Sequence, residues 1–212
     1  MAKKQKTLTD SKSVPTAADP VLYSRFTDFD ISLFRAGRHY KLYEKLGSHV
    51  VSHNGLEGTY FALWAPNAKL VSVEGNFNGW NKSSHPMQVR WDGSGIWEVF
   101  IPGIGTGEVY KYYITSNSGE TLEKADPFAF RWEEPPSTAS IVWDTWYEWN
   151  DKEWMQLRPK KNALNMPMSV YEMHFGSWAR NIESPDVFLS YRQMAAQLIP
   201  YIKTMGFTHV EF

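Results

Sequence analysis

Short β-rich runs separated by turn clusters constrain this chain more than any other feature of its sequence. Between residues 57 and 144 the runs are TYFALWAP, LVSVEGNF, IWEVFIPG, EVYKYYITS and TASIVWD, and between them lie NFNGWN, WDGSG, PGIGTGE and SNSGE. Alternation with period two is typical of half-buried strands, and clusters rich in Gly and Asn are typical of turns. Because no long helical pattern interrupts these runs, the sequence predicts an antiparallel sandwich of immunoglobulin-like type.

Residues 168–212 follow a different pattern. MSVYEMHFGSW begins as a nearly continuous apolar run, which predicts a strand. Ser190 and Gln193 have the spacing of a capping box, and apolar residues then recur on one helical face, with Pro200 expected to kink the helix and Gly206 to end it. FTHVEF predicts a second strand. A strand, a helix and a strand form a βαβ unit whose parallel strands need cover on both faces, so we expect the front part of a longer protein.

The remaining segments are expected to be less regular. Residues 1–20 are rich in Lys, Ser, Thr and Pro, which predicts a disordered leader. Helical spacings with Gly stops predict short helical turns at 21–56. The segment 145–167, which is rich in Trp and Tyr, is interpreted as a linker.

Composition limits the classes of function. The net charge is −1, from 22 basic and 23 acidic residues, which favours neither a nucleic acid nor a membrane surface as partner. The chain has no Cys, which excludes thiolate metal sites and suits a cytoplasmic protein, and no window has the length of a membrane span. Ten Trp residues are suited to a ligand with flat apolar faces, such as a sugar, although packing in the core or an interface is the favoured interpretation for any single Trp.

Several blocks in a fixed order carry a family resemblance. These blocks are LYEKLGSH, FALWAPNAKLVSVEGNFNGW, GEVYKYYI, KADPFAF, YEMHFGSW and YRQMAAQLIPYIKTMGFTHVEF. From about residue 30 to the end the chain resembles the N-terminal part of bacterial 1,4-alpha-glucan (glycogen) branching enzymes, in the alpha-amylase superfamily. YEMHFGSW separates this family from debranching and trehalose-releasing relatives, which share the domain plan.

The resemblance implies a fold and an activity. It implies a glycogen-binding-type module at 57–144, then the first strand, helix and strand of a (β/α)8 catalytic barrel at 168–212. The complete enzyme would transfer α-1,4-glucan segments to form α-1,6 branches by a retaining mechanism with paired carboxylates and without a metal or cofactor. The family's catalytic carboxylates lie on later barrel strands, so none is assigned here and the 212 residues alone are expected to be inactive. The alternatives are a non-catalytic glucan-binding scaffold and another enzyme of the alpha-amylase superfamily, debranching or trehalose-releasing.

The resemblance also implies candidate binding residues. In related modules a Trp after an N-x-W turn and a Lys on a nearby strand contact the glucan, and these roles fall on Trp80 and Lys111. A second stacking Trp is missing, because SNSGE occupies its place. The alternative interpretation is a turn Trp and a solvated Lys. The partner implied is an α-glucan, bound by a monomer.

Four further residues are weaker candidates. Trp91 and Trp97 lie in the module, and the alternation of Trp97 with apolar neighbours favours the core. His174 and Trp178 follow the first predicted barrel strand, on the side where (β/α)8 enzymes build active sites. Packing beneath the loops is the alternative for both.

Overall fold

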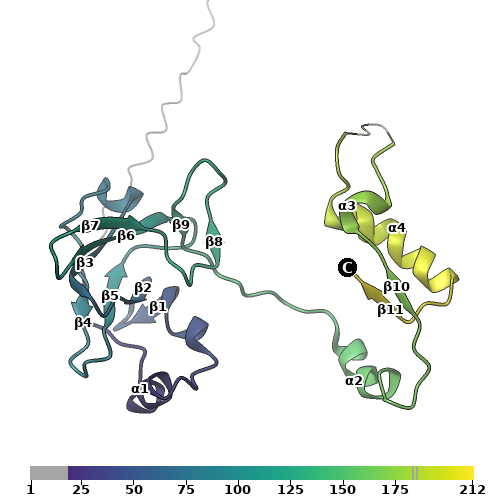
Figure 1. The fold of residues 1–212 in the computed structure, drawn as a ribbon, viewed down its shortest axis with the longest axis horizontal. Helices are drawn as coiled ribbons and strands as arrows, with labels where there is room; N and C mark the ends of the chain where they lie inside the picture. Colours follow the sequence, from purple (N-terminus) through teal and green to yellow (C-terminus); the bar gives the residue numbers. More distant parts are fainter. Residues whose placement is uncertain (1–18, 183, 185) are drawn as a thin grey trace, which may run out of the picture. The chain divides into compact units, whose positions relative to one another are not determined.

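The computed structural model describes residues 19–182, 184 and 186–212 (Figure 1). The predicted leader at 1–20 therefore lies outside the described residues except for its last two. The chain divides after Tyr147 into two compact units. No helix among the described residues has both the length and the apolar composition that crossing a membrane requires.

The first unit consists of two antiparallel sheets, which appear as two layers in Figure 1. One sheet has the order β1-β2-β5-β4, and the other has the order β3-β6-β9-β8 with β7 paired to β6. The prediction of an immunoglobulin-like antiparallel module is confirmed. The strands are β1 (Gly47–His53), β2 (Leu56–Trp64), β3 (Ala68–Gly75), β4 (Gln88–Val89), β5 (Ile96–Pro102), β6 (Val109–Ser116), β7 (Thr121–Lys124), β8 (Arg131–Trp132) and β9 (Ser140–Ile141).

The main core lies between these sheets. Alternate residues of the strands point into it, among them Phe61, Val73, Val99 and Tyr112, each at most 2% exposed. Burying one such side chain contributes about 1.5–3 kcal/mol, so this layer is a major source of the stability of the unit.

A second core covers the outer side of the β1-β2-β5-β4 sheet. The helix α1 (Asp28–Arg35) contributes Ile31, which packs with Leu46, Tyr60 and Phe100. Thr27 begins this helix with a capping box to Asp30. This sheet is therefore covered on both sides.

Two segments differ from the sequence interpretation. The strand β1 lies within 21–56, where only short helical turns are expected. Its sequence did not predict a strand, because Ser and His occupy four of its seven positions and hide the apolar alternation. The helix α2 (Lys152–Lys161) lies within 145–167, where a linker is expected.

The second unit contains a parallel pair of strands with a helix between them in the chain. The strand β10 (Val170–Glu172) pairs in parallel with β11 (His209–Glu211). The helix α3 (Phe175–Trp178) follows β10, and α4 (Tyr191–Thr204) begins at the predicted capping box of Ser190 and Gln193 and contains Pro200. Met173, Leu189, Met194 and Leu198 form the core of this unit.

Candidate functional site

The register of β3 and β6 defines the candidate site. Glu74 on β3 lies opposite Lys111 on β6, and the next pair is Gly75 and Tyr110, where β3 ends. The turn that carries Trp80 begins immediately after Gly75 and also contacts β6. The structure therefore brings Trp80 and Lys111 to the same end of these two strands.

The backbone of the turn holds Trp80 in place. A short 3-10 helix at Asn76–Asn78 is followed by Gly79 and Trp80, both at φ 60° in the left-handed region. A residue with a side chain adopts this conformation only at a cost of about 1–2 kcal/mol, so its neighbours must compensate. The Trp80 N–H donates to the Gly75 carbonyl at 2.9 Å, and its indole N–H donates to Asn76 Oδ1 at 3.0 Å. The indole, which is 38% exposed, is thus fixed and accessible.

Lys111 lies among polar groups that the sequence interpretation did not identify. Its ammonium donates to Thr138 Oγ1 at 2.9 Å. Glu74, beside it on β3, is 1% exposed, and its Oε1 has no hydrogen-bond partner among the described residues. Burial and the nearby Glu123 carboxylate raise the pKa of Glu74. Only the fold reveals these neighbours, because Glu74 and Thr138 are far from Lys111 in sequence.

The other Trp candidates of the module lie elsewhere. Trp91 is 85% exposed in the turn between β4 and β5, beside a hollow lined by α1 residues, and so belongs to the other sheet. Trp97 is 6% exposed in the main core, and its indole N–H donates to the Ala65 carbonyl at 3.0 Å. The assignment of Trp97 as a binding residue is therefore wrong, because no ligand can reach its ring.

His174 immediately precedes the short helix α3, and Trp178 is the last residue of that helix. His174 is exposed, and its Nδ1 lies 2.9 Å from Ser177 Oγ. Trp178 is half-buried, donates its indole N–H to the Tyr171 hydroxyl at 2.9 Å and packs on the Tyr201 ring. The Trp178 ring is thus held by packing, whereas His174 is open to a ligand.

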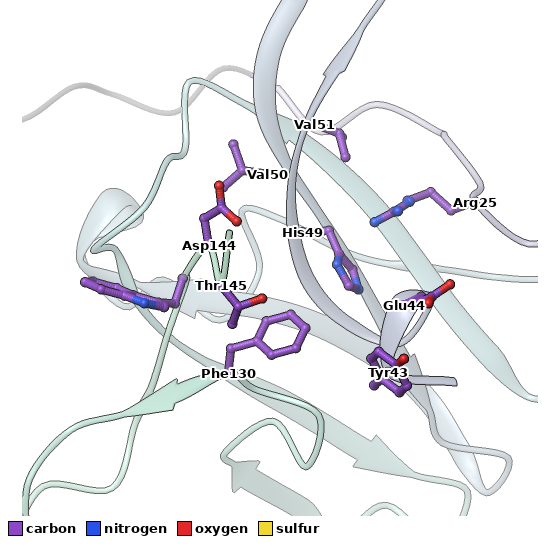
Figure 2. Close-up of a pocket in the computed structure, with 10 residues that line it drawn as sticks. Arg25, Tyr43, Glu44, His49, Val50, Val51, Phe130, Asp144 and Thr145 are labelled. Carbon is purple, nitrogen blue, oxygen red and sulfur yellow. The ribbon is translucent and has the colours of Figure 1, made fainter. Parts of the chain in front are cut away.

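A separate pocket of about 370 Å³ lies in the first unit (Figure 2). Figure 2 shows Arg25, His49 and Glu44 on one side of it and Phe130 and Asp144 on the other. The His49 and Phe130 rings meet edge to face, with centroids 5.7 Å apart. Burial, reinforced by the positive charge of Arg25, lowers the pKa of His49 from 6.5 to about 4.

The lowered pKa predicts an acid-sensitive stability. The unfolded chain takes up a proton at His49 below about pH 6.5, whereas the folded chain does so only near pH 4, so the contribution of His49 is lost as the pH falls between these values. Urea unfolding of the 212-residue chain at pH 7 and pH 4.5 should show a loss from this residue of about 2 kcal/mol. The same pair of measurements on His49→Gln should lack this loss. Equal losses of stability in the wild-type chain and in His49→Gln would show that His49 is not the cause of the acid sensitivity.

The first unit matches a known domain family. Residues 45–129 match carbohydrate-binding module 48, the isoamylase N-terminal domain. The matched segment includes β1 to β7 and both Trp80 and Lys111.

Curated relatives match far more of the chain than the module. The 1,4-alpha-glucan branching enzyme of Aquifex aeolicus is 52% identical over 190 residues, which cover 90% of this chain and 30% of that enzyme. The branching enzyme of Desulfitobacterium hafniense is 47% identical over 186 residues, which cover 87% of this chain and 29% of that enzyme. The resemblance to branching enzymes is confirmed, and the chain spans less than a third of the length of these relatives.

Solved structures share the fold. Klebsiella pneumoniae pullulanase complexed with maltotriose has a TM-score of 0.53 and 24% identity, over 78% of this chain and 17% of the pullulanase chain. The apo form of that pullulanase gives the same TM-score and identity and is covered to 19%. At this level of identity the likeness concerns the fold alone.

Proposed function

We propose that the chain is the N-terminal, glucan-binding part of a 1,4-alpha-glucan branching enzyme, with Trp80 and Lys111 as its α-glucan contacts. The observation that carries the proposal is the fixed, accessible indole of Trp80 beside the end of the strand pair that bears Lys111. The module family and the branching-enzyme relatives support it. The maltotriose in the structurally similar pullulanase is consistent with a malto-oligosaccharide ligand.

The chemistry of the two side chains suits a sugar. The indole offers a flat apolar surface to one face of a pyranose ring. The Lys111 ammonium has three N–H donors, of which one is used by Thr138, so two remain for sugar hydroxyls. Because one ring provides the stacking, we expect weak binding by the isolated chain, with a dissociation constant on the order of 1 mM, or about 4 kcal/mol.

We also propose a role for the second unit, as the start of the catalytic barrel. Its β10, α4 and β11 would be the first strand, helix and strand of a (β/α)8 barrel, with His174 and Trp178 at the carboxyl end of β10, where such barrels bind substrate. The complete enzyme would transfer α-1,4-glucan segments to 6-hydroxyl groups through a covalent glycosyl intermediate formed on a carboxylate. We assign no catalytic carboxylate to the 212 residues. We propose further that the complete enzyme is monomeric and cytoplasmic.

Replacement of the stacking ring tests the binding proposal. Trp80→Ala should weaken retardation of the 212-residue chain in native gels that contain glycogen, with a loss of affinity of about tenfold, or about 1.4 kcal/mol. Trp91→Ala removes an even more exposed indole from the other sheet and should leave retardation unchanged. A loss with Trp91→Ala and none with Trp80→Ala would move the site to the turn between β4 and β5.

A further inference from the structure

A hollow lies farther along the strand pair that carries Lys111. It encloses about 310 Å³ and is lined by apolar and hydroxyl-bearing side chains together with one Lys. The principal lining residues are Leu70, Ser72, Lys82, Pro86, Tyr113 and Thr115. The sequence interpretation assigned no role to this region.

The strand register places the hollow next to the Lys111 site. Glu74 and Lys111 form one cross-strand pair, and the pair two residues farther on the same face is Ser72 and Tyr113. Side chains two residues apart on a strand are separated by about 6.6 Å. The hollow therefore begins one row beyond Lys111, in line with it along β6.

The walls of the hollow are held by backbone pairing. The segment before β4 runs along the edge of β3, where Val73 N–H donates to the His85 carbonyl at 3.0 Å and Met87 N–H donates to the Val71 carbonyl at 2.8 Å. Ser72 Oγ donates to the Lys82 carbonyl at 2.5 Å. An ordered wall favours binding, because less free energy is lost in ordering the protein around a ligand.

A Lys and a Glu lie at the rim of the hollow, beside the ring of Tyr113. The Lys82 ammonium lies 4.7 Å from the centroid of the Tyr113 ring and 2.5 Å from Glu123 Oε1. Tyr113 is half-buried, so part of its ring faces the hollow. The rim thus offers a cationic donor and an anionic acceptor for sugar hydroxyls. A sugar that stacks on the ring face now covered by Lys82 would displace the ammonium from it.

We propose that the hollow over Tyr113 is a second glucosyl subsite, which binds a later sugar of the same α-glucan chain that Trp80 and Lys111 hold. The inference rests on the proposed function, since it extends that site along β6. The Tyr113 ring supplies a second aromatic surface in addition to the Trp80 indole. Balanced rim charges and an apolar floor favour a neutral sugar over an anionic ligand.

Chain-length dependence of binding tests this subsite. Isothermal titration of the 212-residue chain should show that maltoheptaose binds about tenfold more tightly than maltotriose, because the longer sugar reaches both subsites. Tyr113→Leu keeps apolar volume but removes the flat ring, and it should abolish the preference for maltoheptaose while maltotriose binding is unchanged. Tyr40→Leu, at a Tyr that is 87% exposed and lies in the segment between α1 and β1, is the matched control and should retain the preference.

The outcomes separate the two proposals. A Tyr113→Leu protein that keeps the preference for maltoheptaose, or a wild-type chain that binds both sugars equally, overturns the second subsite and leaves the Trp80 site standing. A wild-type chain that binds neither sugar overturns both. If Tyr113→Leu lowers the melting temperature, Leu70→Asn provides the same test, because Leu70 lines the hollow and is 60% exposed.

Discussion

Asp126→Ala is expected to lower the free energy of unfolding of the first unit by about 3–5 kcal/mol. Asp126 is 1% exposed and accepts hydrogen bonds from the hydroxyls of Tyr110 at 2.6 Å and Tyr112 at 3.0 Å, and from the Phe128 N–H at 2.8 Å. Alanine would leave all three donors buried without an acceptor. Since domains are stable by about 5–15 kcal/mol in total, much of the unit's stability depends on this carboxylate.

Urea denaturation followed by Trp fluorescence measures this effect, and a double substitution tests its cause. Tyr110→Phe with Tyr112→Phe removes two of the orphaned hydroxyls, so adding it to Asp126→Ala should recover part of the lost stability. The two Tyr changes could instead cost as much stability in the Asp126→Ala background as they do in the wild-type chain. That result would show that the hydrogen bonds to Asp126 are not the reason for the loss of stability in Asp126→Ala.

Gly75→Ala is expected to cost about 3 kcal/mol or more. A Cβ at this position would lie 2.2 Å from the Val109 carbonyl oxygen and 2.7 Å from the Phe77 ring. The carbonyl belongs to the backbone at the start of β6 and the ring is in the core, so neither can move cheaply. Gly75 is needed for this close approach, and its own backbone is extended.

Gly79 is the matched control for Gly75, because it lies in the same turn with open space around its Cβ position. Its φ of +60° strains any residue with a side chain, so Gly79→Ala should cost about 1–2 kcal/mol. Thermal unfolding of the two variants gives the comparison. A larger loss for Gly79→Ala would mean that backbone conformation, and not the contact with β6, controls this turn.

Much of the fold follows from patterns that a sequence displays directly. Trp97, Val99 and Ile101 occupy alternate positions of β5 and pack in the main core, while Ile96 and Phe100 on the other face pack in the second core. Ser190 and Gln193 have the spacing of a capping box, and both of its hydrogen-bond directions are present at the start of α4. These features can be predicted from the sequence because they depend on residues that are close together in the chain.

The candidate site depended on information that a sequence does not display. The pairing of Glu74 with Lys111 and of Ser72 with Tyr113 is set by the register of two strands far apart in the chain. A shift of one residue would turn Lys111 into the core, and composition alone does not fix that choice. The resemblance supplied Trp80 and Lys111, but the hollow over Tyr113 became visible only in the fold.

The most direct test of the account is to map α-glucan binding residue by residue. Two-dimensional NMR of the ¹⁵N-labelled 212-residue chain, titrated with maltoheptaose, reports the backbone amides and the indole N–H of each Trp. If α-glucan binds at the proposed site, the largest shifts occur at the Trp80 indole and at the amides of Lys111 and Tyr113, with Trp91 and Trp97 unchanged. Shifts confined to the Arg25 and His49 pocket or to the turn that carries Trp91 would contradict it.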